Sequence, residues 1–214
     1  MSAAEAFERL LTGVEREILS GLRSPARIQA FLDGIAYSTD DFYRCPLRVL
    51  QDRVAHCFDG AIFAAAALQR IGYPPLILDM LSNGRDDEHL LALFKADGCW
   101  GAVAKSNFVG LRFREPVYRS LRELAMSYFE QYYNLEREKT LRGYTGPLNL
   151  KSFDRLDWMT QDEPLERIAK RTEEIRRVEL LRKGMTQRLS PVDERSFQAG
   201  LIGADPEGLF KLQP

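Results

Sequence analysis

The chain has 214 residues, of which 45% are hydrophobic and 29% are charged, and its formal net charge is −1. This length allows one large domain with a substantial core, and the near-zero charge argues against nucleic acid as the main partner. No apolar run reaches membrane-spanning length, and the N-terminal segment lacks the apolar block of a signal peptide. Three cysteines, an odd number, favour free thiols in a reducing compartment, so we expect a cytoplasmic protein without a membrane partner.

The first third of the chain is predicted to be helical. Apolar residues at helical spacing predict a helix over residues 3–22. Ser24 and Pro25 are a typical N-cap and first helical residue, and they start a second helix that ends near residue 35. A short helix over residues 46–54 and an alanine-rich helix over residues 58–69 follow.

The middle of the chain supplies the predicted strands. Residues 76–81 have the composition of a strand, and residues 89–104 are predicted to form a β-hairpin that turns at Asp97-Gly98. An apolar stripe then predicts a long helix over residues 116–129.

The composition changes after the glycine- and proline-containing stretch at residues 143–147. Residues 162–183 are densely charged with a thin apolar seam, which predicts a solvated helix that packs one face on the body. The tail from Ser190 onward is predicted to be irregular. The expected organisation is therefore a core over residues 1–150 and a helical extension over residues 151–214 that packs on it.

Cys57 is the candidate nucleophile. It lies where a loop-like stretch becomes the alanine-rich helix, so we expect it at the first turn of that helix and at the floor of a cleft. The helix dipole favours a thiolate there, and the N–H groups of the first turn can stabilise an oxyanion. Cys45 and Cys99 are interpreted as ordinary packing cysteines.

The general base is one of only two histidines, His56 and His89. His56 is adjacent to Cys57 and projects about 100° away from it on a helix, so a capping or core role is expected for His56. His89 comes from another element and can face the sulfur, which makes it the predicted base. We expect a ring nitrogen of His89 within about 4 Å of the Cys57 sulfur.

The predicted base also needs a partner that holds its ring. A tight turn at Asp97-Gly98 places Ser106 opposite His89, and one added residue in the loop places Asn107 there. Asn107 is preferred because its amide oxygen can accept from the imidazole N–H without titrating.

The order of the Cys57 helix, a strand, a turn, the His89 strand and its hairpin resembles the catalytic core of the transglutaminase-like superfamily. The resemblance covers roughly residues 50–110. It is carried by His56-Cys57-Phe58-Asp59-Gly60-Ala61, Leu68-Gln69-Arg70-Ile71-Gly72-Tyr73-Pro74, Glu88-His89-Leu90 and Asp97-Gly98-Cys99-Trp100.

This resemblance implies a papain-like scaffold and a Cys-His-Asp triad that acts as a peptidase, amidase or acyltransferase. The aspartate of the family usually lies about four residues after the hairpin tryptophan, where this chain has Ala104. The His89 ring must then find its partner in Ser106, Asn107 or a backbone carbonyl. By analogy with papain-like enzymes, Gln51 and the Cys57 backbone N–H are the candidate oxyanion donors, with a surface position as the alternative for Gln51.

Two charged groups are candidates for substrate binding. Arg112 and Arg114 can hold a substrate carboxylate through a bidentate contact, or they pair with nearby glutamates on the surface. The acidic run at residues 86–88 is interpreted as a solvated loop, with binding of a cationic substrate end as the sharper alternative.

The sequence therefore predicts an α+β protein with a papain-like, transglutaminase-like core. In it the nucleophile helix packs on a small antiparallel sheet, with extra helices at both ends. The expected function is cysteine-dependent acyl chemistry on a peptide or small amide, by hydrolysis or transfer to an amine, with no cofactor. The alternative is a catalytically inactive binding module of the same fold. No metal is expected, since Cys57, His89, Cys99 and His56 lack the paired spacing of a zinc site.

Overall fold

The computed structural model describes residues 2–211; Met1 and residues 212–214, which belong to the predicted core and extension, lie outside the described part. The α-helices are α1 (Ala3–Leu10), α2 (Gly13–Gly21), α3 (Pro25–Asp33), α4 (Pro46–Asp52), α5 (Cys57–Arg70), α6 (Leu121–Met126), α7 (Glu163–Glu173) and α8 (Glu194–Gly200). The strands are β1 (Ala36–Tyr37), β2 (Val54–Ala55), β3 (Leu76–Leu81), β4 (His89–Ala96), β5 (Cys99–Val103), β6 (Arg114–Tyr118), β7 (Gly143–Thr145), β8 (Leu148–Asn149) and β9 (Arg177–Glu179). Short 3₁₀ helices occur at Val109–Leu111, Phe129–Gln131, Leu150–Leu156, Thr186–Arg188 and Pro206–Gly208.

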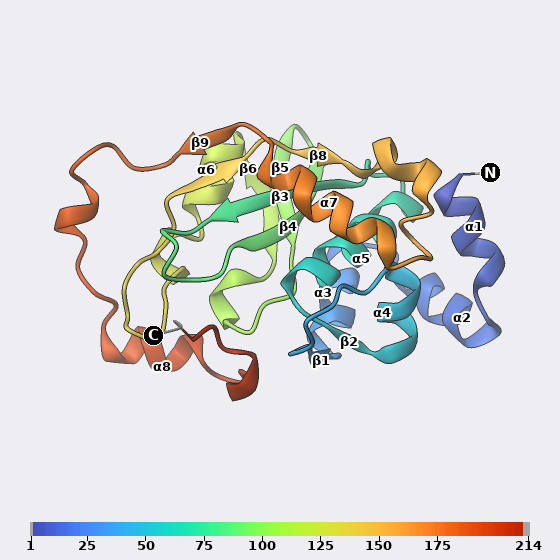
Figure 1. The fold of residues 1–214 in the computed structure, drawn as a ribbon, viewed down its shortest axis with the longest axis horizontal. Helices are drawn as coiled ribbons and strands as arrows, with labels where there is room; N and C mark the ends of the chain where they lie inside the picture. The colour runs from blue at the N-terminus through green and yellow to red at the C-terminus, as the bar shows by residue number, and fades with distance from the viewer. Residues whose placement is uncertain (1, 212–214) are drawn as a thin grey trace.

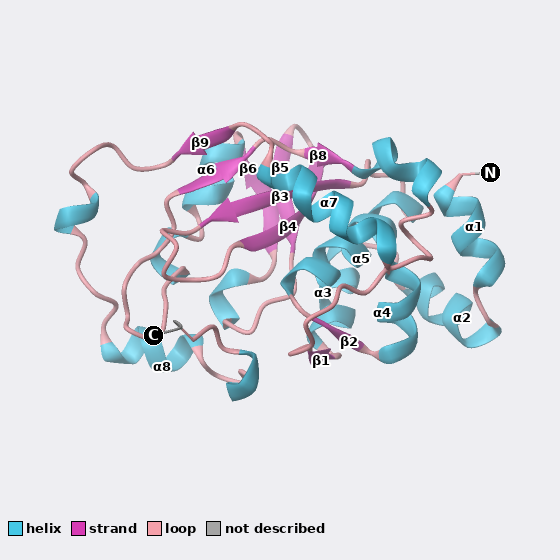
Figure 2. Cartoon of the chain, in the orientation of Figure 1, coloured by secondary structure: helices cyan, strands magenta, loops and turns pink. Residues whose placement is uncertain are grey.

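The main sheet is antiparallel, with the strand order β6-β5-β4-β3-β7-β9 and with β8 pairing on β3, while β1 and β2 form a separate parallel pair. Helices α1 to α5 gather at one end of the molecule, whereas α8 lies toward the other end, and the chain after α8 turns back so that Gly208 packs on Tyr37 of β1 (Figure 1). Figure 2 shows the strands grouped between these helical parts. The predicted mixed α+β fold is confirmed. None of the described helices is long and apolar enough to cross a membrane.

Helix α5 is the central support of one sheet face. Its alanine-rich side chains are small, so the helix lies close to the strands, and every residue from Phe58 to Leu68 is buried. Along β4, Leu90 and Ala92 belong to the core on this face, whereas Leu91 and Leu93 belong to a second core on the opposite face. This alternation follows from the two-residue period of a strand.

The β4–β5 hairpin has the predicted turn and register. Asp97 and Gly98 both have positive φ angles, 49° and 81°, as the tight two-residue turn of a hairpin requires. Ala96 is paired with Cys99, as expected for that turn.

The helix predicted over residues 116–129 is wrong in its first part. Residues 114–118 form β6 at the edge of the sheet, and the helix α6 begins only at Leu121, after Ser120 caps it by accepting from the Glu123 N–H. Pro116 has no N–H to donate, which suits an edge strand, and Val117 and Tyr118 are residue types that strands favour.

Two other predicted helices are shorter than expected. The run over residues 3–22 is divided into α1 and α2 because Thr12 starts a new helix with a capping box to Glu15. The charged run over residues 162–183 is helical only through Glu173, and Arg177–Glu179 then form β9 on the edge of the sheet beside β7. The segment after residue 150 therefore includes a strand of the main sheet as well as helices.

Gly60 marks a place where α5 and the end of β5 approach too closely for a side chain. A Cβ at this position would lie 2.2 Å from the Cβ of Lys105. That atom is bonded directly to the Lys105 backbone, so it cannot move aside without moving the backbone. We expect Gly60→Ala to lower the free energy of unfolding by about 1–3 kcal/mol, measured by urea denaturation. Gly21→Ala is the control, since its Cβ would meet nothing within 4 Å. An equal loss in both variants would contradict this close contact.

Candidate active site

Cys57 is the first residue of α5, as expected, and His56 is the N-cap. The His56 Nδ1 atom accepts from the Asp59 N–H at 3.2 Å, and the Asp59 carboxylate accepts from the His56 N–H at 3.4 Å. This capping box fixes the start of the helix and occupies the His56 ring in a structural contact. The predicted capping role of His56 matches this geometry.

The Cys57 side chain is half-buried and lines a cavity of about 490 Å³. Its S–H group lies 3.8 Å from the Glu88 carbonyl oxygen, to which it donates. Burial, followed by the nearby carboxylates of Asp87 and Asp79, raises the pKa of Cys57 to about 12. The sulfur is therefore a neutral thiol at neutral pH, in spite of its place at a helix N-terminus.

His89 is the first residue of β4 and is buried. Its Nε2 atom lies 2.8 Å from the Leu111 carbonyl oxygen. Because a carbonyl can only accept, Nε2 carries the proton and Nδ1 holds the basic lone pair. Burial lowers the pKa of His89 to about 4, so the ring is neutral at neutral pH.

Cys57 and His89 line one small cavity of about 50 Å³, at the end of the sheet where β4 begins. They approach it from different sides. His89 is paired with Met80, which belongs to the core opposite α5, whereas the Cys57 sulfur meets the backbone of Glu88 on the α5 side. Within residues 2–211, no hydrogen bond joins the sulfur to the ring. The expected thiol–imidazole contact therefore remains a prediction.

The partner of the His89 ring differs from the one that we preferred. Both polar atoms of the Asn107 side chain are bonded to the Asp205 backbone, each at 2.7 Å, and the Ser106 hydroxyl accepts from the Phe108 N–H. The ring is instead bonded to the Leu111 carbonyl, because the chain after β5 turns back through a 3₁₀ helix at Val109–Leu111.

The buried methyl group of Ala104 offers no polar atom, which agrees with the expectation that a carboxylate is missing.

Three other predicted site residues lie away from the Cys57 cleft. Gln51 is exposed on α4. The pKa of Glu15 is lowered mainly by the hydrogen bond from the Thr12 backbone N–H and, to a smaller extent, by the Gln51 side chain. Arg112 forms an ion pair with Asp33 at 3.2 Å, consistent with a structural role rather than with a substrate carboxylate.

The Arg114 side chain likewise contacts residues outside the cleft. Its guanidinium group lies 3.8 Å above the Tyr128 ring and donates to the Ser127 hydroxyl at 3.0 Å. The structure therefore does not place Arg112 and Arg114 at the Cys57 cleft, which differs from the prediction.

The cleft residues that the sequence-based predictions missed include Tyr37 and Asp79. Tyr37 lines both cavities beside Cys57, and burial raises its pKa well above the usual range. No sequence signal points to Tyr37, whereas Asp79 is a lone carboxylate inside the apolar strand Leu76–Leu81.

The acidic run before His89 is only partly a solvated loop. Asp87 and Glu88 are exposed at the rim of the larger cavity, whereas Asp86 accepts from the Thr140 hydroxyl at 2.5 Å. Cys45 is buried, and burial raises its pKa to about 12. The described residues contain no group of histidines, cysteines and carboxylates placed to hold a metal ion.

Of the comparisons with known proteins, only the one with solved structures gives matches. No family model matches the chain, and no curated protein is significantly similar to it. Among solved structures, LapG from Legionella pneumophila is similar at 14% identity and a TM-score of 0.43, over 78% of this chain and 98% of LapG. Its EGTA-treated form has a TM-score of 0.42 over the same shares, and its calcium-bound form has 0.43 over 79% and 99%.

Proposed function

We propose that this chain catalyses acyl chemistry on an amide bond through the Cys57 thiol, in the manner of a transglutaminase-like hydrolase or acyltransferase. The observation that carries this proposal is the placement of Cys57. It begins α5, it opens into a cavity large enough for a ligand, and it shares a second, smaller cavity with a neutral histidine.

The neutral state of both groups determines how the first step proceeds. A thiolate–imidazolium pair is not preformed, because burial raises the pKa of Cys57 and lowers the pKa of His89. His89 Nδ1 therefore takes the thiol proton as the sulfur attacks the carbonyl carbon, which forms the C–S bond and leaves an oxyanion. Leu111 accepts from Nε2–H and so holds the ring while it becomes an imidazolium.

Two groups beside the sulfur can stabilise the oxyanion. The Cys57 backbone N–H has no acceptor within its helix, and Tyr37 lines both cavities that contain Cys57. Collapse of the oxyanion breaks the C–N bond, and the proton on His89 passes to the leaving nitrogen. Water or an amine then attacks the thioester carbonyl and gives a proton to His89. The C–S bond breaks, and the proton passes from His89 to the sulfur, which restores the Cys57 thiol. In this mechanism Tyr37, and not Gln51, is the second oxyanion donor.

A specific observation favours the alternative, an inactive binding module of the same fold. The Leu111 carbonyl carries no full charge, so it stabilises an imidazolium less than a carboxylate does. The raised pKa of Cys57 further lowers the fraction of thiolate.

A covalent peptide probe separates the two functions. A peptide vinyl sulfone is a weak electrophile that reacts with a thiol much faster when a nearby base and the bound peptide bring the two groups into place. We expect it to modify Cys57 and to leave Cys45 and Cys99 unmodified, as mapped by mass spectrometry of the digested protein. Cys99→Ser should react like the wild type, and Cys57→Ala should not react. Equal and slow modification of all three cysteines would support the binding module.

A further inference from the structure

The larger cavity beside Cys57 is lined by acidic side chains. The carboxylates that line it are Asp40, Asp79, Asp87, Glu88, Glu173 and Glu207. No lysine or arginine lines it in the part of the chain that the structure describes. Asp40 is neutralised by an ion pair with Arg44, so the other carboxylates supply the charge of the cavity.

Asp79 distinguishes this cavity from an ordinary acidic surface. Asp79 is only 2% exposed, and its Oδ1 atom is buried without a hydrogen-bond partner in residues 2–211. The Thr145 hydroxyl accepts from the Asp79 backbone N–H, so this contact does not satisfy the carboxylate. A buried carboxylate without a partner is costly, so an atom of this kind in a cavity wall points to a ligand that completes it.

The surroundings of Asp79 favour a cation. Burial, followed by repulsion from the nearby Glu88 carboxylate, raises the pKa of Asp79 to about 8. Without a cation, Asp79 is therefore mostly protonated at neutral pH, and a bound positive charge favours its carboxylate form.

The rest of the wall suits an organic cation. The rings of Tyr43 and Phe58 lie 4.3 Å apart and both line the cavity, and aromatic faces attract guanidinium and ammonium groups. The carboxylates are not gathered as metal ligands, since no metal-binding group occurs in the described residues. The volume of about 490 Å³ accommodates an extended side chain together with part of a peptide backbone.

We propose that this cavity binds the arginine or lysine side chain of a peptide whose neighbouring amide is presented to Cys57, with Asp79 and Glu88 as the charge partners. The proposal rests on the proposed function, because it names the substrate class of the same site. Asp79 lies opposite Leu90 in the β3–β4 pair, and Leu90 follows His89 on β4 while Glu88 immediately precedes it. A side chain held there leaves its own peptide backbone next to the sulfur.

Arginine and citrulline provide the sharpest comparison, because the two side chains have nearly the same shape and only arginine is charged. The protein is the full chain with Cys57→Ala, which binds without turnover. We expect an acetylated arginine peptide amide to bind at least about tenfold more tightly than its citrulline counterpart by calorimetry, as for one charge-assisted contact. Asp79→Asn in this background should remove most of that difference.

Two further variants keep the test valid if Asp79→Asn fails to fold. Glu88→Gln and Glu173→Gln change exposed residues of the cavity and should each reduce the preference for arginine. Glu174→Gln is the matched control for Glu173, because Glu174 lies outside the cavity and pairs with Arg171. It should leave the preference unchanged.

The affinity should also depend on pH with a definite sign. The carboxylate form of Asp79 binds the cation, so the affinity for arginine should rise as pH increases toward about 8 and then level off. The charged and titratable groups around Asp79 are Glu88 just before β4, Glu173 in α7, Arg177 in β9 and Cys57 in α5. Of these, Arg177 opposes the rise in the pKa of Asp79. The citrulline peptide should show no such rise.

Failure of this proposal and failure of the proposed function have different signatures. Equal binding of the arginine and citrulline peptides, or an unchanged preference in the folded Asp79→Asn protein, overturns the cation site. Tight binding of arginine by a wild-type protein that never modifies or cleaves the peptide supports the cation site and overturns the catalytic function. Cleavage of neutral and basic peptides at equal rates supports catalysis and overturns the cation site.

Discussion

Replacing His89 with glutamine is expected to lower the rate of amide cleavage by about 100- to 10,000-fold, the usual contribution of a general base. Glutamine keeps an N–H group that can donate to the Leu111 carbonyl, but it has no basic atom to take the thiol proton. The loss should appear in kcat more than in KM, because the ring acts on the reacting proton. The measurement is steady-state cleavage of a fluorogenic peptide amide.

The other histidine provides a matched control for this variant. His56→Asn keeps an efficient N-cap, so it should retain most of the activity. The reverse result, with activity lost in His56→Asn and kept in His89→Gln, would transfer the role of base to His56.

The pH profile of the wild-type enzyme gives independent support. The base must be neutral to act, and burial lowers the pKa of His89 to about 4, so kcat/KM for a neutral peptide should hold down to about pH 5 and fall below it. A fall centred on the ordinary histidine value of about 6.5 would show that the buried ring is not the group that limits the rate.

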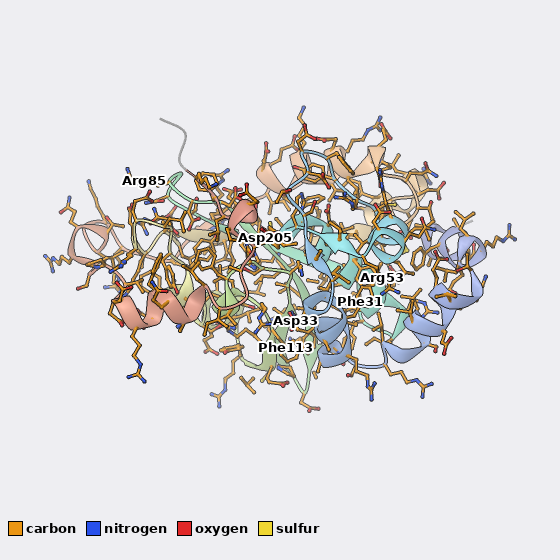
Figure 3. The ribbon with its side chains drawn as sticks, turned by 90° about the horizontal axis from the view of Figure 1, so that it is seen from below. Phe31, Asp33, Arg53, Arg85, Phe113 and Asp205 are labelled. Carbon is orange, nitrogen blue, oxygen red and sulfur yellow. The ribbon has the colours of Figure 1, made fainter. Side chains whose placement is uncertain are left out.

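Replacing Asn107 with alanine is expected to raise the rate at which iodoacetamide alkylates Cys57 by about tenfold. The Asn107 side chain makes two hydrogen bonds to the Asp205 backbone and so fastens the C-terminal segment at residues 205–210, which lines the cavities around Cys57. Figure 3 shows Asp205 near the middle of the molecule, where this segment returns from α8. Each hydrogen bond contributes about 1 kcal/mol, and 1.4 kcal/mol is a factor of ten in an opening equilibrium.

The contact at Gly208 explains why the segment lies so close to the site. A Cβ on Gly208 would be 2.5 Å from the Tyr37 ring, so the backbone packs directly on this ring beside the sulfur. Removing the segment admits water, which should lower the pKa of Cys57 from about 12 toward its ordinary value and raise the thiolate fraction.

Two measurements test this attachment, namely the alkylation rate at pH 7 and hydrogen exchange of the backbone at residues 205–211. Asn149→Ala is the control, because Asn149 is an asparagine that caps a 3₁₀ helix elsewhere by accepting from Lys151. A slower alkylation in Asn107→Ala would instead agree with the role of Asn107 that the sequence first suggested, as the group that orients His89.

The sequence by itself determined the elements whose signals are local. Ser24 and Pro25 define the start of α3 by capping, and the small residues of α5 define how closely that helix packs. Asp97-Gly98 defines the hairpin turn through its positive φ angles. The α+β class and the position of Cys57 at a helix start follow from such signals. Local patterns were insufficient over residues 114–118, where pairing with β5 outweighed an apolar spacing that also suits a helix.

Only the tertiary structure decided how the candidate site is completed. The Leu111 carbonyl reaches His89 from 22 residues away, and Asp205 reaches Asn107 from 98 residues away, so neither contact leaves a trace in local spacing. The charge states are also a tertiary property. Helix position alone favours a thiolate at Cys57, whereas burial and the carboxylates of Asp79 and Asp87 favour the thiol. Desolvation outweighs the helix dipole here because the low dielectric of a buried site penalises any unpaired charge.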